Sequence, residues 1–177
     1  MKLLEEREQR EKLIKAVKDF RKRKVLLEKE RRRYFGHFDK YLDRVKESPR
    51  WLSKPEIAEI VAEAIKFQDG KHYELEAYCI MSNHVHLVIE VQRSDAPLYK
   101  ILQKLKSYTA IQANKILNRS GAFWHHESYD HVVRDGNELE RIIGYVLDNP
   151  VKANLCKTWE DWKWSYINPE YVSTAKL

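Results

Sequence analysis

Residues 72–91 read HYELEAYCIMSNHVHLVIEV, and this stretch decides the fold. Its two halves, 72–82 and 84–91, are rich in β-branched, aromatic and alternating residues and meet at a Ser-Asn pair. This pattern predicts two strands joined by a hairpin. Successive side chains of a strand point to opposite faces, so His84 and His86 project from the same face. Such a pair either chelates a metal ion or forms part of a polar, solvent-facing surface.

Helical periodicity surrounds this hairpin. Three segments with apolar stripes are expected to be helices: 52–67, 94–117 and 137–149. The last segment begins with Asn137 and Glu140 at the spacing of a capping box, and Pro150 is expected to prevent its continuation. Helices that alternate with hairpin-like strands predict an α+β fold in which helices cover an antiparallel sheet.

Two other segments are rich in aromatic residues. Residues 122–134, AFWHHESYDHVVR, predict one or two short strands, and residues 159–166, WEDWKWSY, are expected to pack as a cap on the core. Trp124 either stacks on unpaired bases or belongs to the core. Lys106 and Arg134 are candidates for phosphate contacts.

The composition is that of an ordinary globular protein, with 34% charged and 43% hydrophobic residues among 177. No apolar run approaches the length of a membrane span, and the two cysteines are isolated, so we expect a cytoplasmic protein without a membrane partner. The expected organisation is a basic, mostly helical N-terminal segment at 1–48 and one domain at 49–177.

The net charge of +6 is unevenly distributed. Residues 1–50 contain 18 Lys/Arg against 10 Asp/Glu, a balance of +8, which leaves −2 for the rest of the chain. The run Arg31, Arg32 and Arg33 favours a contact with DNA, because clustered cations attract polyanions. The alternative is a solvated helical face of mixed charge.

The expected helix 137–149 carries a candidate polar pair. Its apolar residues form one arc: Leu139, Ile142, Ile143, Val146 and Leu147. Tyr145 and Asn149 are four residues apart and lie together at the edge of this arc. They either belong to a functional site, or Tyr145 is amphipathic at the core boundary and Asn149 is the helix C-cap.

Five blocks in order carry a family resemblance: MSNHVHLVIE, LQKLKSYTAIQANKI, FWHHESYDHVVRD, YVLDNPVKANL and WKWSY. Over about residues 50–168 the chain resembles the REP-associated tyrosine transposases, which are single-tyrosine HUH transposases of insertion-sequence type. The resemblance implies a ferredoxin-like antiparallel sheet, with the metal-binding histidines His84 and His86 on a central strand. It places the nucleophile at Tyr145 and the third metal ligand at Asn149.

Two imidazoles and one amide oxygen favour Mg²⁺ or Mn²⁺ over a structural zinc ion. The resemblance implies a metal-dependent transposase, an endonuclease and strand transferase that joins Tyr145 to a DNA 5′ phosphate. The implied partner is single-stranded or hairpin DNA of palindromic repeats. We expect the protein to act as a monomer or a homodimer, associated with the nucleoid. Tyr108 is a rival nucleophile, although only Gln112 lies four residues after it and no Asn-Pro follows.

One feature departs from the family. Its members usually open with a β-strand, whereas no candidate strand precedes residue 72. We therefore expect either a start that is truncated or a sheet that is one strand short. The alternative function is a catalytically inactive DNA-binding protein of the same fold. A third possibility, a His-x-His metal hydrolase of small molecules, predicts additional Asp or His ligands on other strands.

Overall fold

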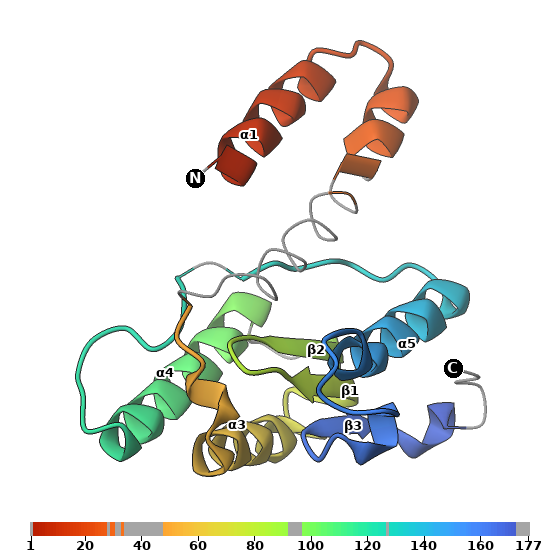
Figure 1. Cartoon of the computed structure of the whole chain (residues 1–177). Helices are drawn as coiled ribbons and strands as arrows, with labels where there is room; N and C mark the ends of the chain where they lie inside the picture. Colours follow the sequence, from red (N-terminus) through yellow and green to blue (C-terminus); the bar gives the residue numbers. More distant parts are fainter. Residues whose placement is uncertain are drawn as a thin grey trace. The chain divides into compact units, whose positions relative to one another are not determined.

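The computed structural model describes residues 2–27, 29–30, 33, 48–91, 97–126 and 128–172. The chain forms two compact units, Met1–Ser48 and Pro49–Leu177. In the first unit, α1 spans Lys2–Lys15, and residues 20–27 are also helical (Figure 1). Arg33 is helical and exposed, whereas Arg31 and Arg32 lie outside the described residues.

The second unit is built on a three-stranded antiparallel sheet in the order β2-β1-β3. The strands are β1 (Tyr73–Ile80), β2 (Val85–Val91) and β3 (Ser165–Ile167). The hairpin and the α+β class are therefore confirmed. Residues 159–166 were expected only to cap the core, but the last two, Ser165 and Tyr166, belong to β3.

The resemblance placed the histidines on a central strand, and this is wrong within the described residues. There β2 pairs with β1 alone, so β1 occupies the centre and β2 an edge. No described residue ahead of Tyr73 belongs to a strand. The pairing of β1 with β2 shifts register between Leu75 and Ala77, which is the mark of a β-bulge at Glu76.

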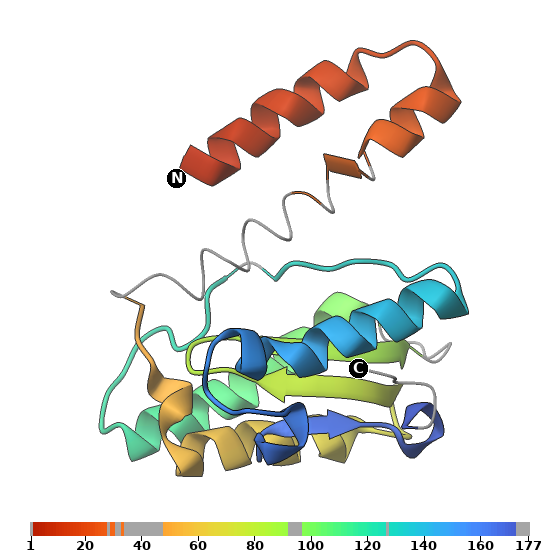
Figure 2. The same cartoon turned by 45° about the vertical axis from the view of Figure 1, so that its right-hand side comes forward.

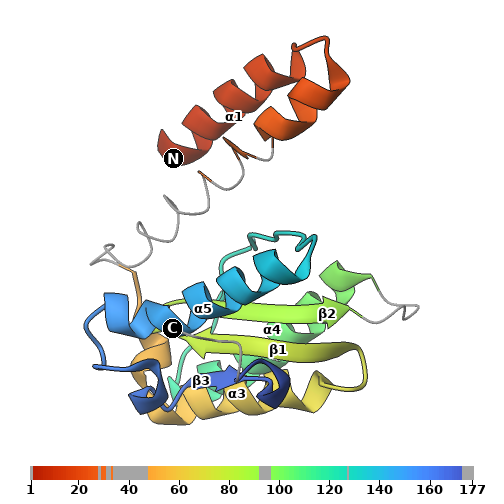
Figure 3. The same ribbon diagram turned by 90° about the vertical axis from the view of Figure 1, so that its right-hand side faces the viewer.

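Helices cover both faces of this sheet (Figure 3). The principal helices are α3 (Pro55–Gln68), α4 (Leu98–Ile116) and α5 (Gly136–Lys152). Short 3₁₀ turns lie at Trp51–Ser53, Trp159–Asp161 and Pro169–Tyr171. Helices α3 and α4 cover one face and α5 crosses the other (Figure 2). Among the described helices, none has the length and apolarity that a bilayer crossing requires.

Strand alternation divides the core into two clusters. On the α3/α4 face, Tyr78 and Ile80 of β1 pack with Ile65 and Ile101. On the α5 face, Cys79 and Val88 of the sheet pack with three buried residues of the arc on α5, which are Ile143, Val146 and Leu147. Because His86 and Val88 alternate with the α3/α4-facing residues of β2, His86 belongs to the α5 face.

The ends of α5 differ from the sequence prediction. The N-cap is Asp135, whose Oδ1 accepts from the Glu138 backbone N–H at 2.8 Å, so the Asn137/Glu140 cap is wrong. Pro150 lies inside the last turn, and α5 continues to Lys152. Proline lacks an N–H but still supplies a carbonyl, which accepts from the Leu155 N–H at 2.8 Å and closes the helix one turn later.

The segment 122–134 forms no strand among its described residues. Phe123 and Trp124 turn toward the α3/α4 core instead of joining a ladder, and their rings meet edge to face at 4.8 Å. In this segment, Phe123 and Trp124 therefore pack against the core and do not form a strand. The strand prediction for it is wrong.

Candidate active site

The two histidines converge at the start of β2. His84 Nε2 lies 2.9 Å from His86 Nε2, and the rings are nearly perpendicular, with centroids 4.7 Å apart. His86 is only 8% exposed and stands opposite Cys79 in the sheet register. Its buried position on a paired strand argues against the alternative of a polar, solvent-facing surface.

Asn83 orients the first ring. Its Oδ1 lies 2.8 Å from His84 Nδ1. With the amide oxygen as acceptor, His84 Nδ1 is the donor, and a neutral ring then has its lone pair on Nε2. That lone pair points at His86 Nε2, and two such nitrogens need a proton or a cation between them. Residue 83 thus takes part in the site, a role that its position in a hairpin turn concealed.

Tyr145 reaches the histidines from α5. Its ring meets the His86 ring edge to face, with centroids 6.3 Å apart and an interplanar angle of 89°. The helix and the strand lie far apart in sequence, and packing of α5 on the sheet brings them together. The structure therefore unites His84, His86 and Tyr145, as the sequence predicts.

Asn149 follows one helical turn after Tyr145 and is 2% exposed. It lies inside α5, three residues before the last one, so the alternative that it is the C-cap is wrong. Among the described residues, its Nδ2 atom has no hydrogen-bond partner. A buried amide with an open position costs free energy, so its retention here calls for a role other than packing.

This donor set fits a hard divalent cation. Two nitrogens bound at about 2.1 Å and at right angles to one ion lie about 3.0 Å apart, close to the observed 2.9 Å. A half-turn of the Asn149 amide places its oxygen where the unpaired nitrogen now lies. Among the described residues, no three His, Cys, Asp or Glu side chains are grouped to hold a metal. The family resemblance adds Asn149 to the histidine pair as the third candidate ligand.

Two charged residues of α5 flank Tyr145. Lys152 Nζ lies 4.7 Å from the centre of the Tyr145 ring and 2.9 Å from Asp148 Oδ2. An ammonium over an aromatic face is attracted to the electron density of the ring. Lys152 was missed in the sequence, although its spacing of seven from Tyr145 places it on the same face of a helix.

Lys106 and Trp124 both hold the loop that leads to α5. Lys106 Nζ donates to the His125 carbonyl at 3.0 Å, and burial lowers the pKa of this lysine. Trp124 is half-buried, and its Nε1 donates to Thr109 Oγ1 at 2.8 Å. The structure does not bring either residue to the histidines. Their contacts with DNA stay predictions.

The loop joins α5 through Glu138, which is 6% exposed. Its carboxylate accepts from the Arg134 backbone N–H at 3.1 Å and lies 3.2 Å from His131 Nε2. Burial alone raises the pKa of Glu138, but these hydrogen bonds outweigh burial and the pKa lies below its usual value. The Arg134 side chain is exposed, as a phosphate contact requires.

The sequence pattern of the IS200-like transposases matches residues 16–149. A REP-associated tyrosine transposase of Haemophilus influenzae is 27% identical over 109 residues. That match covers 55% of this chain and 62% of the relative, so the chain spans less than two thirds of the relative's length. A solved structure of a REP-associated tyrosine transposase bound to a REP hairpin is similar in fold, with a TM-score of 0.53 and 18% identity. This match covers 69% of this chain and 70% of the solved one.

The fold and three converging residues, His84, His86 and Tyr145, define the class of protein: an antiparallel sheet holds a histidine pair against a helix that carries a tyrosine. The family pattern covers most of the chain. The protein belongs to the IS200-like transposase family.

Proposed function

We propose that this protein is a metal-dependent single-strand DNA endonuclease and strand transferase of the HUH type. It cleaves at or near palindromic repeat hairpins through a covalent 5′-phosphotyrosine. Family membership and the similarity to REP-associated tyrosine transposases support the choice of reaction and of DNA. The observation that carries the proposal is the convergence of Tyr145 on a histidine pair with chelate spacing.

The protein's own residues have separate tasks in this reaction. His84, His86 and Asn149 hold Mg²⁺ or Mn²⁺, which when bound withdraws electron density from the scissile phosphate. The contact between Asn83 Oδ1 and His84 Nδ1 holds the ring so that Nε2 faces His86, where it would be available to the cation. Strand β2 fixes His86, and the hairpin turn before it holds His84, whose carbonyl accepts from the Met81 N–H at 2.9 Å. Packing of α5 on the sheet fixes Tyr145 against them.

Tyr145 supplies the nucleophile. Its oxygen forms a bond to phosphorus while the bond from phosphorus to the 3′ oxygen breaks, which leaves a phosphotyrosine and a free 3′-OH. The Lys152 ammonium lies 4.7 Å from the centre of the Tyr145 ring, where it would offset part of the phosphate charge. The phosphotyrosine bond keeps the energy of the phosphodiester, so a second 3′-OH can attack it and rejoin the strands.

DNA contacts outside this centre complete the proposal. Arg33, with Arg31 and Arg32, belongs to the basic N-terminal unit and is assigned to phosphate contacts, as are Lys106 and Arg134. Trp124 is assigned to base stacking through the part of its ring that stays exposed. The nucleoid is the proposed location of the enzyme.

The test is to incubate the protein with a labelled single-stranded repeat hairpin and Mn²⁺, then to denature it. A DNA adduct that survives denaturation is expected for the natural protein and is expected to be absent with EDTA or with Tyr145→Phe. Tyr145→Phe removes one oxygen and little volume, so it serves as a folded, DNA-binding control. Hairpin binding with no adduct under any metal contradicts the proposal and indicates the catalytically inactive DNA-binding protein.

A further inference from the structure

The outer face of α4 carries a stripe of cations around two exposed hydrophobic side chains. Lys100, Lys104, Tyr108, Ile111 and Lys115 follow one another at helical spacings and fall within an arc of about 80°. All five are exposed, Tyr108 by 55% and Ile111 by 56%. We call these five residues the α4 stripe.

Charge is segregated around this stripe. Residues 97–126 contain five Lys/Arg and no Asp or Glu, although the chain after residue 50 carries a net charge of −2. Elsewhere in this unit, three exposed lysines pair with carboxylates: Lys66 with Glu63, Lys152 with Asp148 and Lys163 with Glu59. Within the described part of the chain, no carboxylate forms an ion pair with a lysine of the α4 stripe.

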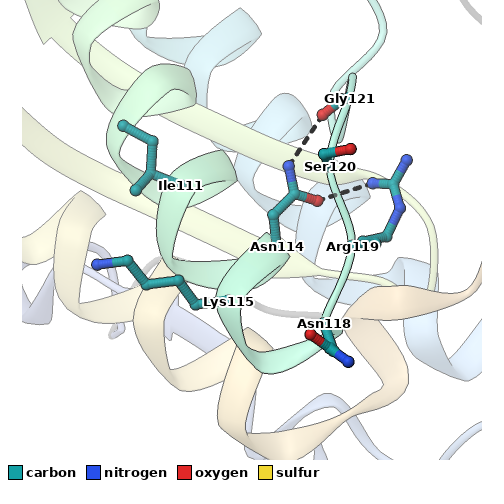
Figure 4. Close-up of a pocket in the computed structure, with 7 residues that line it drawn as sticks. All are labelled: Ile111, Asn114, Lys115, Asn118, Arg119, Ser120 and Gly121. Carbon is teal, nitrogen blue, oxygen red and sulfur yellow. Dashed lines mark hydrogen bonds between the residues drawn. The ribbon is translucent and has the colours of Figure 1, made fainter.

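A hollow of about 410 Å³ continues the stripe at the C-terminal end of α4 (Figure 4). Its lining comes from the end of α4 and the following turn: Ile111, Asn114, Lys115, Asn118, Arg119, Ser120 and Gly121. Asn114 Nδ2 donates to the Gly121 carbonyl at 2.9 Å, and its Oδ1 accepts from Arg119 at 2.8 Å. The Arg119 guanidinium also lies 4.2 Å from the centre of the Trp51 ring. These contacts hold the turn in place, so the hollow is part of the folded structure.

The backbone conformation of residues 118–121 also indicates that the turn after α4 has a defined structure. Gly121 has φ +93°, which is open to glycine and strained for other residues, and Asn118 has φ 48°. Both residues lie in the lining. The turn is therefore a defined shape beside cations, rather than a loose connection.

We propose that the α4 stripe and this hollow bind a single-stranded segment of DNA. Lys100, Lys104 and Lys115 pair with successive phosphates, and Tyr108 stacks on an unpaired base. Charge complementarity selects a polyanion, and the exposed aromatic ring among the cations selects one with unpaired bases over a duplex. The choice of DNA rests on the proposed function, but the binding itself does not require cleavage.

The position of the stripe makes it a second DNA-binding surface. Helix α4 covers the face of the sheet opposite to α5, and the histidines and Tyr145 lie on the α5 face. The segment 118–135 connects the end of α4 to the start of α5. A strand held on α4 therefore stays bound by a surface that takes no part in the chemistry at Tyr145.

The test is fluorescence anisotropy of the full-length protein with a labelled oligo(dT), at several salt concentrations. Lys104→Gln/Lys115→Gln is expected to weaken binding about ten-fold and to flatten the slope of log K against log salt by roughly 1.4, the value for two phosphates of a single strand. The matched control, Lys66→Gln/Lys163→Gln, removes the same charge from lysines that are paired with glutamates, and it is expected to bind like the natural protein.

A second variant tests the stacking. Tyr108→Ser is expected to weaken oligo(dT) binding about five-fold or more without a change in salt slope, and Tyr108→Phe is expected to bind normally. A blunt duplex is expected to lose little with Tyr108→Ser. Equal affinity of the Lys104/Lys115 variant and its control overturns the proposal, and so does normal oligo(dT) binding by Tyr108→Ser.

The adduct assay separates this proposal from the proposed function. At saturating hairpin, the α4 variants are expected to form the adduct in the yield of the natural protein. A natural protein that binds oligo(dT) through α4 but forms no adduct contradicts the proposed function alone. Normal adduct formation with no effect of the α4 variants on binding contradicts the α4 proposal alone.

Discussion

Helices α4 and α5 cover opposite faces of one sheet, and each carries a tyrosine with an amide four residues later. On α5, Tyr145 meets His86 and lies under Lys152. On α4, Tyr108 is 55% exposed on the outer side, across the sheet from the histidines. A tyrosine with a helically spaced amide is therefore not a site by itself. The strand that the helix covers decides what the tyrosine can do.

The two helices also differ in whether their buried polar side chains are hydrogen-bonded. Thr109 on α4 is fully buried and satisfied, because its Oγ1 donates to the Leu105 carbonyl and accepts from Trp124 Nε1, both at 2.8 Å. Asn149 on α5 is equally buried, but its Nδ2 has no partner among the described residues. We infer that Thr109 serves stability and Asn149 serves the site.

The largest effect is expected at the histidines. His84→Ala or His86→Ala removes a metal ligand, so adduct formation should fall by about 100-fold or more. Hairpin affinity should stay within about two-fold, because phosphate contacts elsewhere supply most of it. His126→Ala, at an exposed histidine on the loop before α5, is the matched control. A His84→Ala protein that cleaves at the natural rate contradicts the metal site.

Asn149→Ala is expected to have the next largest effect. The nucleophile remains while one ligand is lost, so activity should fall about 10- to 100-fold and recover in part at high Mn²⁺. The rise in melting temperature caused by Mn²⁺ should shrink as well. An unchanged Mn²⁺-induced rise would show that this amide does not reach the ion.

Thr109→Val tests whether the buried polar group of α4 contributes to stability and not to the reaction. The change keeps the volume but leaves the Trp124 N–H without its acceptor, so the free energy of unfolding should fall by about 1–3 kcal/mol. Urea denaturation followed by tryptophan fluorescence measures this loss. Adduct formation at low temperature should be normal. Loss of the adduct in a variant of unchanged stability would mean that α4 takes part in the chemistry.

The smallest effect is expected at Glu138, where the loop joins α5. Its pKa is lower in the folded protein than in the unfolded chain, so the carboxylate stabilises the fold above the unfolded value of about 4.3. This contribution is lost as the pH falls through the folded value. Glu138→Gln should lower the melting temperature by roughly 2–4 °C at pH 7 and by less in acid. Glu140→Gln, at an exposed position on the same helix, should show no such pH dependence.

The sequence predicted the helices and strands that are specified by the pattern of neighbouring residues. The β1–β2 hairpin follows from two strand-like runs that meet at Ser82-Asn83, and the buried side of α5 follows from a repeat of three and four residues. Strand β3 was missed because three residues carry little pattern, and its ladder depends on Ala77 and Cys79, which lie almost ninety residues earlier. Residues 122–134 were predicted to be strands because aromatic and β-branched residues are common in strands. Phe123 and Trp124 instead pack against the α3/α4 core. The sequence alone does not distinguish an aromatic residue in a strand from one that packs from a loop.

The candidate site was predicted only in part. Spacing and family resemblance identified His84, His86, Tyr145 and Asn149 as candidates. The roles of Asn83 and Lys152 depend on side-chain directions that only the packed helix and strand define. The N-terminal arginines and their assignment to DNA stay predictions.

The most direct test of the account is to locate the DNA on the protein. The adduct formed with a repeat hairpin and Mn²⁺ is digested with nuclease and protease, and mass spectrometry identifies the modified tyrosine. The account predicts a nucleotide on Tyr145, within the peptide that contains Asn149. A nucleotide on Tyr108 would contradict it, because the tyrosine on the face without histidines would then be the nucleophile.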